Sequence, residues 1–347
     1  MKPNKKIKIG NKIIGDGEPC FIIAEAGSNH NRDLSQAKRL IDVAKDAGVD
    51  AVKFQTYSAE TLYPKEMSPL RLLKETRKPF DIIKEREIPR EWHGILAEYS
   101  KNQGLIFLST PFDKEAIDQL NPLVPAFKWA SPELIDRPLL EYVAEKGKPL
   151  IISTGFYGLR EISDAIKWAR SKGNNQIILL HCVGLYPPLY EELNLKAIET
   201  LKKRFNVPVG LSDHSIDVVI PAVAVALGAN IIEKHFTLSR KAKGPDHPYA
   251  LEPSELKEMV RNIRNIEKSL GSGIKKPVKR EIEKERLIRR GVATKRFLRK
   301  GEKITAKDII TKRVGAGAVL PNDFYKILNK TLKKNIKADQ KLTWRII

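Results

Sequence analysis

Two histidines stand at the ends of neighbouring apolar runs in the second half of the chain. His235 ends the run "IIEKH", and His214 directly follows "GLSD" in the run before it. Two neutral imidazoles, completed by a carboxylate or water, suit a divalent transition metal such as Mn²⁺, Fe²⁺, Co²⁺ or Zn²⁺. Because neighbouring strands would bring the two rings together, the pattern favours a metal site at His214 and His235. A pair of structural histidines is the alternative.

Lysines and hydroxyl groups end the other apolar runs. Lys53 and Lys128 are single lysines among apolar residues, and polar residues end further runs at Ser109, Thr110, Ser131, Ser153, Thr154, Ser212 and Asp213. Compact cations with short hydroxyl donors suit a phosphate and a carboxylate. Unpaired buried polar groups cost about 1–3 kcal/mol each, so these residues are hard to explain as core filling. The alternative for each hydroxyl is that it caps the following helix.

The elements that must position these residues alternate between strand and helix. Eight short runs are predicted as strands, at residues 21–25, 50–55, 105–110, 126–131, 149–154, 176–181, 207–212 and 230–235. Amphipathic segments of helical period lie between them, for example at 34–48, 137–148, 159–173 and 254–271. Eight such units predict an α/β fold of the (β/α)₈ TIM-barrel type, with its chemistry at the C-terminal ends of the strands. A doubly wound sheet is the alternative, but "AEAGSNHN" after the first run lacks the G-x-G-x-x-G turn.

Composition and charge limit the classes of function. The chain has 347 residues, a formal net charge of +21 and two cysteines, which favour a reducing cytoplasm over a disulfide framework. No apolar run approaches the ~18–20 residues of a membrane span. Residues 274–313 hold 16 Lys+Arg against 5 Asp+Glu, which we interpret as a solvated basic linker and surface. A basic binder of nucleic acid or glycans is the alternative, but no basic stripe interleaved with aromatic residues supports it. We therefore expect no nucleic-acid and no membrane partner.

Longer motifs resemble one enzyme family over nearly the whole chain. They are "FIIAEAGSNHNRDLSQAKRLIDVAKDAGVDAVKFQTY", "LSTPFD", "KWASPELIDRPLLEYVAEKGKPLIISTG", "LLHCVGLYP", "VGLSDHS", "IIEKHFTL" and "GPDHPYALEP". In this order they resemble the sialic acid (nonulosonic acid) synthases. The resemblance implies condensation of phosphoenolpyruvate with the open aldehyde form of an N-acyl amino sugar, and a divalent metal, in the first place Mn²⁺. N-acetylmannosamine would give N-acetylneuraminate and phosphate.

The resemblance leaves the sugar open. Synthases of legionaminate or pseudaminate, which act on a 2,4-diacetamido-trideoxyhexose, and synthases acting on a 6-phosphorylated N-acetylmannosamine share nearly all these motifs. The motif "HCVGLYP" favours the neuraminate and legionaminate side, because pseudaminate synthases often have lysine in place of His181. Gly184 departs from the family, which often carries Asn, Ser or Thr there, so a side-chain contact is lost or supplied by backbone.

Roles for single residues follow from the same resemblance. It implies that phosphoenolpyruvate is bound by Lys53, Thr110, Lys128, Ser131, Ser153 and Ser212, and that His214 and His235 are the metal ligands and act in catalysis. It assigns proton handling to Glu25 and Glu133, and contacts with the sugar to Gln55, Tyr186, Asp246 and Arg313.

The C-terminal part resembles the antifreeze-like (SAF) module of these synthases. We expect a synthase barrel over residues 1–271, a linker over 272–288 and the SAF domain over 289–347, with a turn at 300–302 and a helix start in "TAKDI" at 305–309. In the family this module is contributed across a dimer, and Arg313 matches the arginine that reaches the partner's sugar. The resemblance therefore implies a domain-swapped homodimer.

Overall fold

The computed structural model describes residues 6–69 and 76–347. The first five residues of the basic N-terminus and residues 70–75 lie outside this description. The chain divides into two compact units, Met1–Gly271 and Ser272–Ile347, each with its own core.

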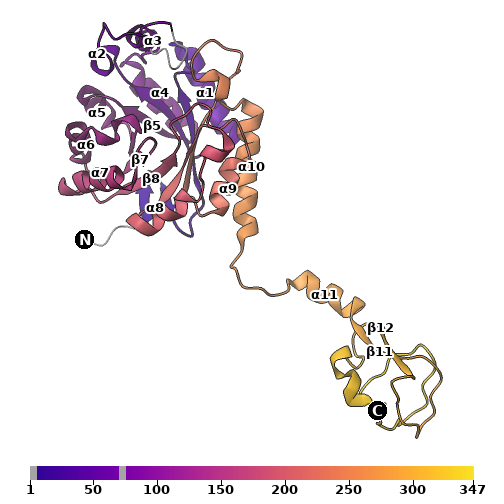
Figure 1. Ribbon diagram of the computed structural model, residues 1–347. Coiled ribbons are helices and arrows are strands. Elements are labelled where there is room, and N and C mark those ends of the chain that lie inside the picture. The colour runs from indigo at the N-terminus through magenta and orange to yellow at the C-terminus, as the bar shows by residue number, and fades with distance from the viewer. Residues whose placement is uncertain (1–5, 70–75) are drawn as a thin grey trace. The chain divides into compact units, whose positions relative to one another are not determined.

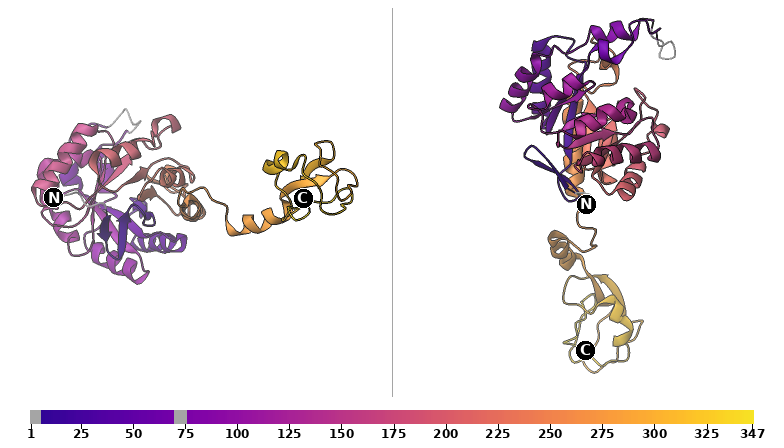
Figure 2. Two further views of the ribbon diagram at one scale, coloured as in Figure 1. Left: turned by 90° about the horizontal axis from the view of Figure 1, so that it is seen from below. Right: turned by 90° about the vertical axis from the view of Figure 1, so that its left-hand side faces the viewer.

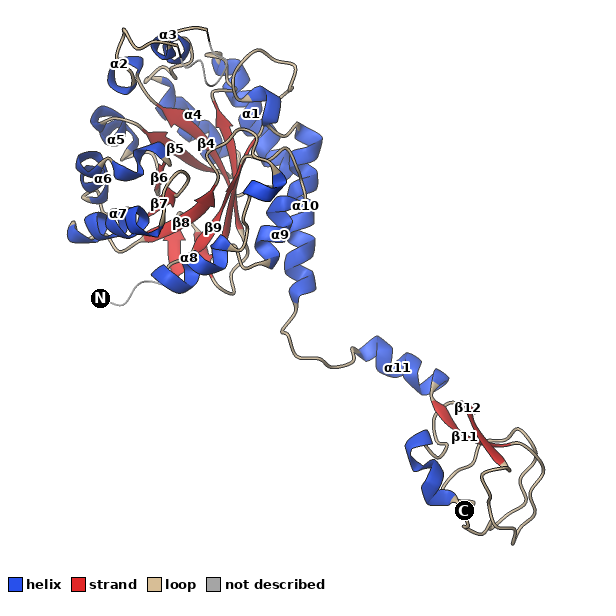
Figure 3. Cartoon of the chain, viewed as in Figure 1, coloured by secondary structure: helices blue, strands red, loops and turns tan. Residues whose placement is uncertain are grey.

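The first unit is built on eight parallel strands, which lie inside a layer of helices (Figures 1 and 3). The strands are β3 (Phe21–Gly27), β4 (Ala51–Thr56), β5 (Ile106–Pro111), β6 (Phe127–Trp129), β7 (Leu150–Ser153), β8 (Ile177–Cys182), β9 (Val209–Asp213) and β10 (Ile231–His235). Ladders join them in the order β5-β4-β3-β10-β9-β8-β7-β6, and β5 also lies against β6. The predicted TIM-type barrel is confirmed, and each predicted strand is found.

Helices surround these strands, as the view from below in Figure 2 shows. They are α1 (Leu34–Ala47), α2 (Ala59–Leu62), α3 (Pro79–Lys84), α4 (Trp92–Asn102), α5 (Lys114–Leu120), α6 (Arg137–Ala144), α7 (Leu159–Ser171), α8 (Ala197–Phe205), α9 (Ile220–Ala226) and α10 (Pro253–Leu270). Helix α1 shows why they form. The Asp33 carboxylate caps its first turn, Leu40 and Ile41 are buried against the sheet, and Gly48 ends it with a φ of 81°, which glycine adopts without strain.

A short hairpin packs apolar side chains against the residues at the start of several strands. It consists of β1 (Lys6–Ile9) and β2 (Lys12–Gly15), which pair antiparallel. Its Ile7, Ile9 and Ile14 are buried in one cluster with apolar residues of the barrel strands, among them Phe21 and Ile231. The apolar filling therefore lies toward the N-terminal ends of the strands, and the polar residues lie toward their C-terminal ends.

The second unit has a small core of its own. Helix α11 (Lys279–Ile288) leads into strand β11 (Arg290–Thr294), which pairs antiparallel with β12 (Ile309–Arg313). Its core contains Val292, Leu298, Ile304, Ile309, Val319, Ile327, Leu332, Ile336, Leu342 and Ile347.

The helix predicted to start in "TAKDI" is wrong. Residues 305–308 form a turn, and strand β12 begins at Ile309. The Asp308 carboxylate accepts hydrogen bonds from the Thr305 backbone N–H at 2.9 Å and from its hydroxyl at 2.6 Å. The Thr and Asp that resemble a helix start therefore close a turn, because the same side-chain bonds stabilise both structures. The predicted turn at 300–302 is present, with Gly301 at a φ of 88°.

The structure also bears on membrane insertion. Within residues 6–69 and 76–347, no helix combines the length and the apolar character needed to cross a bilayer.

Candidate active site

The C-terminal ends of the barrel strands surround a small polar pocket of about 60 Å³. Most of the residues singled out from the sequence line it: Glu25, Lys53, Gln55, Thr110, Lys128, Ser131, Ser153, Tyr186, Ser212, His214 and His235. They come from all eight barrel strands or the loops that follow them, so residues far apart in sequence meet at one end of the barrel. The barrel geometry thus brings together the predicted anion-binding, proton-handling and metal-binding groups.

The first half of the pocket is organised around Lys53. Its ammonium lies 2.8 Å from Glu25 Oε2 and donates to the Thr110 hydroxyl at 3.1 Å. The other oxygen of Glu25 accepts a hydrogen bond of 2.7 Å from Gln55 Nε2. Each of these side chains is held by its neighbours, so the ammonium and the carboxylate keep fixed positions before any ligand binds.

The second half is organised around Lys128 and a carboxylate that the sequence analysis missed. Lys128 donates to the Ser153 hydroxyl at 2.7 Å, and its ammonium lies 3.6 Å from Glu233. Glu233 also lies 3.7 Å from the Lys53 ammonium and accepts from the Ser212 hydroxyl at 3.0 Å. Period-two alternation could have revealed Glu233, because it stands two residues before His235 and so points to the same face of the strand.

The buried charges of this cluster balance. Burial lowers the pKa of Lys53, but the carboxylates of Glu233 and Glu25 outweigh burial and raise it above the ordinary value. Burial lowers the pKa of Lys128 by more than Glu233 raises it. Burial also raises the pKa of Glu233, but Lys128 and Lys53 hold it below its ordinary value. Two ammonium groups and two carboxylates therefore form a nearly neutral cluster, and an anionic ligand would compete with the carboxylates for the lysines.

The two histidines lie side by side beyond this cluster. Their ring centroids are 5.8 Å apart with an interplanar angle of 67°. His214 Nδ1 makes a 2.8 Å hydrogen bond with the Val183 carbonyl, which fixes the proton on Nδ1 and leaves Nε2 as a lone-pair donor. Burial, and after it His235, lowers the pKa of His214 to about 3, so its ring is neutral at physiological pH.

These features fit a divalent metal held by two imidazoles. Among the described residues, His235 Nδ1 is buried and lacks a hydrogen-bond partner, as a nitrogen kept for a ligand would. The part of the chain that the structure describes contains no group of three or more His, Cys, Asp or Glu placed to hold a metal. The protein would therefore supply two nitrogen ligands, and water or substrate would complete the coordination.

A second pocket of about 270 Å³ borders His235. It is lined by three residues predicted to face the sugar, Gln55, Tyr186 and Asp246. The Tyr186 ring stacks on His214 with centroids 4.0 Å apart. Asp246 accepts two 3.0 Å hydrogen bonds from the backbone and hydroxyl of Ser28, so it is fixed at the rim.

A glycine allows this close arrangement. Gly27 has a φ of 52°, and a Cβ atom there would stand 2.6 Å from the Asp246 carboxylate and 3.3 Å from the His235 ring. The ladder between β3 and β4 shifts register at the same point, between Glu25 and Gly27. This bulge, next to the site, lets the loop carrying Asp246 approach the strand end.

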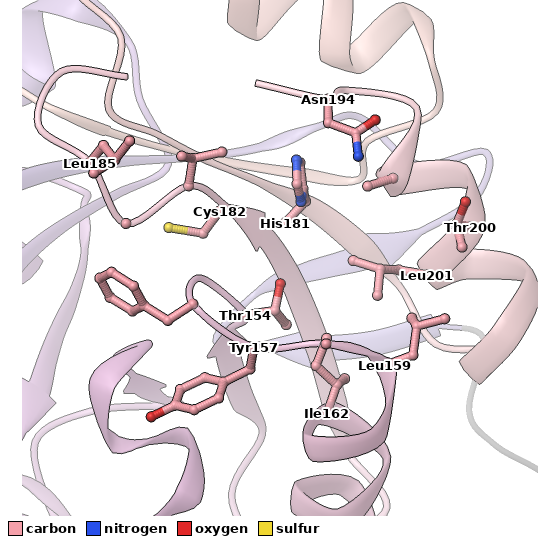
Figure 4. Close-up of a pocket in the computed structure, with 15 residues that line it drawn as sticks. Thr154, Tyr157, Leu159, Ile162, His181, Cys182, Leu185, Asn194, Thr200 and Leu201 are labelled. Atoms are coloured by element: carbon pink, nitrogen blue, oxygen red, sulfur yellow. The ribbon is translucent and has the colours of Figure 1, made fainter. Parts of the chain in front are cut away.

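A third pocket of about 430 Å³ lies beside the site, between the loops after β7 and β8 and helices α7 and α8 (Figure 4). It shares Phe156, Cys182 and Gly184 with the polar pocket. Phe156 has a φ of 70° and is 66% exposed. A Cβ atom at position 184 would stand 2.0 Å from its ring. Phe156 thus occupies the space that a side chain at position 184 would need.

Other candidates lie outside the polar pocket. His181 lines the third pocket and bonds to the Leu193 carbonyl at 2.7 Å. Thr154 donates to the Leu180 carbonyl rather than capping a helix, and Ser109 bonds with Thr56. The polar groups of these side chains are satisfied by contacts within the fold, and none of the three lines the polar pocket.

Two predicted site residues have different positions. Glu133 follows Ser131 in a 3₁₀ turn, Pro132–Ile135, and its Oε2 is buried without a partner within the described chain. Burial raises its pKa to about 7. Arg313 is exposed at the end of β12 in the second unit, so its predicted role is not part of the barrel geometry.

Comparison with known proteins gives consistent relatives. Residues 40–275 match the model of the NeuB family, and residues 289–345 match the SAF domain. The chain is 41% identical to N,N'-diacetyllegionaminic acid synthase of Legionella pneumophila, over 100% of this chain and 99% of that one. It is 45% identical to an uncharacterized protein of Methanocaldococcus jannaschii, over 98% of each. The structure of the N-acetylneuraminic acid synthetase of Leptospira borgpetersenii superposes with a TM-score of 0.73 at 38% identity, covering 81% of this chain and 95% of that one.

The raised pKa of Glu133 predicts a pH-dependent stability. From its ordinary pKa of 4.5 up to about 7, the folded protein keeps a proton that the unfolded chain has released, so stability falls as pH rises through this window. Glu133→Gln should remove that loss, which we place at about 2 kcal/mol for this partly exposed group. Guanidinium unfolding of both proteins at the two ends of the window measures it. The same change in unfolding free energy with pH in both would contradict the burial of an unpaired carboxyl group.

The contact between Phe156 and Gly184 predicts coupling between the two positions. Gly184→Ala places a methyl group where the Phe156 ring lies, so the ring must move, at a cost of about 1–3 kcal/mol. In Phe156→Ala the same methyl group has room, so a double-mutant cycle should show coupling of about 1 kcal/mol or more. Strictly additive unfolding free energies would mean that the ring does not restrict position 184.

Proposed function

The chain belongs to the NeuB family, and we propose that it condenses phosphoenolpyruvate with N-acetylmannosamine and water to give N-acetylneuraminate and phosphate. The family is that of the nonulosonic acid synthases, and the chain is an enzyme of this kind. The single observation that carries the proposal is the polar pocket itself. It places two buried lysines and several hydroxyl groups directly beside two buried histidines.

The lysine half of the pocket suits phosphoenolpyruvate. Its phosphate and carboxylate need cations and short donors, which are supplied by Lys53, Lys128, Thr110, Ser131, Ser153 and Ser212. In the structure the lysines are paired with Glu25 and Glu233. An anionic ligand that takes over these ammonium groups loosens the carboxylates, and a loosened carboxylate beside the reacting carbons is available for proton transfer.

The histidine half suits the metal, and we propose Mn²⁺ as the first choice. His214, through Nε2, and His235 would hold it beside the reacting groups. A bound divalent ion supplies Lewis acidity toward the aldehyde oxygen of the sugar. The stacked ring of Tyr186 and the hydrogen bond from His214 to Val183 keep the first imidazole in place.

The chemistry can be followed atom by atom. Carbon 3 of the enol bonds to the aldehyde carbon, whose oxygen becomes a hydroxyl group, and positive charge develops at carbon 2. Water adds at carbon 2, and one of its protons is passed to the former aldehyde oxygen. The tetrahedral species then expels phosphate by cleavage of the C–O bond, and the remaining proton of the added water leaves with the phosphate as the ketone forms. Lys53 and Lys128 would hold the phosphate throughout.

Two carboxyl groups are suited to the proton transfers. Glu25 is fixed between Lys53 and Gln55 inside the pocket, and we propose it as the group that takes the proton from the attacking water. Burial raises the pKa of Glu133 to about 7, above that of an ordinary carboxyl group, so it is suited to give a proton. Their different surroundings separate an acid from a base, as proton transfer in both directions requires.

A relative of this chain supports a second candidate for the sugar substrate. The Legionella pneumophila relative, named for N,N'-diacetyllegionaminic acid, matches this chain over its whole length. The second candidate substrate is therefore a 2,4-diacetamido-trideoxyhexose, which is less polar than N-acetylmannosamine. In either case we propose that the sugar lies against Gln55, Tyr186 and Asp246 in the 270 Å³ pocket.

We further propose that two chains exchange their SAF domains to complete each site. The loops after β8 and β9 expose large apolar side chains next to the pocket: Leu185, Tyr186, Leu189, Tyr190, Ile216 and Val219. Such a patch beside a polar pocket is typical of an interaction surface. Arg313 is exposed on the second unit and would reach the sugar of the partner chain.

The proposed reaction is tested by phosphate release and product mass with phosphoenolpyruvate, Mn²⁺ and a panel of sugars. The panel contains N-acetylmannosamine, its 6-phosphate and 2,4-diacetamido-trideoxyhexoses. We expect turnover with one of them, and transfer of oxygen from labelled water to the sugar acid but not to phosphate. His214→Ala and His235→Ala should lower kcat at least about 1,000-fold, because the metal site is lost.

His181→Asn is the matched control, because this histidine is the last but one residue of the neighbouring strand β8 and lines the other pocket, and the variant should retain most of the activity. Full activity in both histidine variants would contradict the metal assignment. Lack of phosphate release with every sugar would contradict the proposed substrates.

The exchanged SAF domain predicts complementation between inactive chains. Arg313→Ala should mainly raise the KM for the sugar, so at low sugar concentration both this variant and His235→Ala are nearly inactive. In a mixed dimer, the Arg313→Ala chain supplies an intact barrel and the His235→Ala chain supplies Arg313. When equal amounts of the two variants reassemble at random, half of the dimers are mixed and each mixed dimer has one complete site. About a quarter of the wild-type activity should therefore return.

As a control, Arg313→Ala is mixed with the double variant Arg313→Ala/His235→Ala, which cannot supply the arginine. Activity that stays at the sum of the separate variants after reassembly would show that each chain uses its own Arg313, or none.

A further inference from the structure

A buried ion pair lies on the opposite face of the two strands that carry the histidines. Lys234 directly precedes His235, and Asp213 directly precedes His214. These two residues are partners in the β9–β10 ladder, and the ammonium lies 2.6 Å from the carboxylate. Because side chains alternate along a strand, Asp213 and Lys234 point away from the pocket while the histidines point toward it.

The network around this pair is closed. The Lys234 ammonium also donates to the backbone carbonyl and, at 3.2 Å, to the hydroxyl of Ser215. Asp213 accepts from the Ser215 backbone N–H at 2.9 Å and from its hydroxyl at 3.0 Å. The side chains of Lys234 and Asp213 are 1% and 0% exposed. One ammonium group thus ties together the residue before His235 and the residues on both sides of His214.

A buried ion pair of this kind adds little to the free energy of unfolding by itself. Removing two charges from water costs as much as their attraction returns, and apolar replacements of buried pairs are often neutral or stabilising. What an apolar pair cannot reproduce is direction, because the ammonium requires its acceptors at fixed angles. The network therefore fixes the relative position of two backbone segments.

We propose that Asp213 and Lys234 are positioning residues that set the distance between the two metal-binding imidazoles. This inference rests on the metal in the proposed function. Neither side chain points toward the metal position, so both act through the backbone of the histidines. Together they also add no net charge. An unpaired ammonium one residue from the site would repel a dication, and Asp213 prevents this.

The test separates position from stability. Asp213→Asn/Lys234→Met removes both charges while the asparagine can still accept from the Ser215 N–H. We expect the melting temperature of the metal-free protein to change by less than about 5 °C. The Kd for Mn²⁺, measured by calorimetry and by electron paramagnetic resonance of the ion, should rise about 10- to 100-fold. Affinity for phosphoenolpyruvate alone should stay within about 2-fold, because Lys53 and Lys128 are unchanged.

A matched ion pair at the other end of the strands serves as the control. Asp50 directly precedes β4 and lies 3.0 Å from Arg264 of α10. Asp50→Asn/Arg264→Met alters a partly buried pair of the same barrel far from the strand ends that carry His214 and His235. We expect it to leave the Kd for Mn²⁺ unchanged, whatever it does to the melting temperature.

A second variant covers the case in which the double substitution fails to fold. Asp213→Glu keeps both charges but lengthens one side of the network by a methylene group. It should weaken Mn²⁺ binding several-fold and broaden the resonance of the bound ion. Unchanged Mn²⁺ affinity in Asp213→Glu and in any folded double variant would overturn the inference while the proposed function stands. Wild-type protein that binds no Mn²⁺ would overturn both.

Discussion

The structure depends on burying two lysines at the mouth of a barrel. An isolated ammonium group in such a place is costly, and in many proteins it would lose its proton. Here Lys53 and Lys128 are balanced by Glu25 and Glu233, and the hydroxyl groups of Thr110 and Ser153 accept hydrogen bonds from the ammonium groups. This balance stabilises the two buried lysines and also makes the pocket sensitive to charged ligands. A ligand with two anionic groups would compete with Glu25 and Glu233 for the two ammonium groups.

Much of this could be predicted from the sequence, because the signals are local and repeated. Eight β-branched runs and the segments between them specify the barrel, and a barrel collects its strand ends at one face. The lysines and histidines were identifiable because each breaks an apolar run. Glu233 was missed for a physical reason. It stands between Ile232 and Lys234 inside the run, and its local signal is the two-residue spacing from His235 that places both on one face of the strand.

Alternation also explains the candidates that do not join the site. Asp213 is in the same run as Ser212, yet it faces the helices, and Thr154 bonds to the backbone of the neighbouring strand. Position 184 shows a different limit. Gly184 reads as a lost contact, but the space belongs to Phe156, which comes from another loop. A contact between two loops has no periodic signal, so sequence patterns could not reveal it. In the second unit, the turn at Thr305 has the residues of a helix start. The same side-chain hydrogen bonds stabilise a turn and a helix start, so the local sequence does not distinguish them.

The charge balance of the pocket affects how the metal and phosphoenolpyruvate would bind in the proposed reaction. The buried groups of the pocket sum to nearly zero, so a divalent cation alone would enter a site with no excess negative charge, and a phosphorylated enol alone would enter one with no excess positive charge. Bound together, the two ligands compensate each other at short range, where a medium of low dielectric constant makes the attraction strong. Metal and phosphoenolpyruvate should therefore favour each other's binding, and by linkage the effect is equal in both directions. The neutral sugar adds no charge, so its binding depends on shape and hydrogen bonds in the neighbouring pocket rather than on this electrostatic coupling.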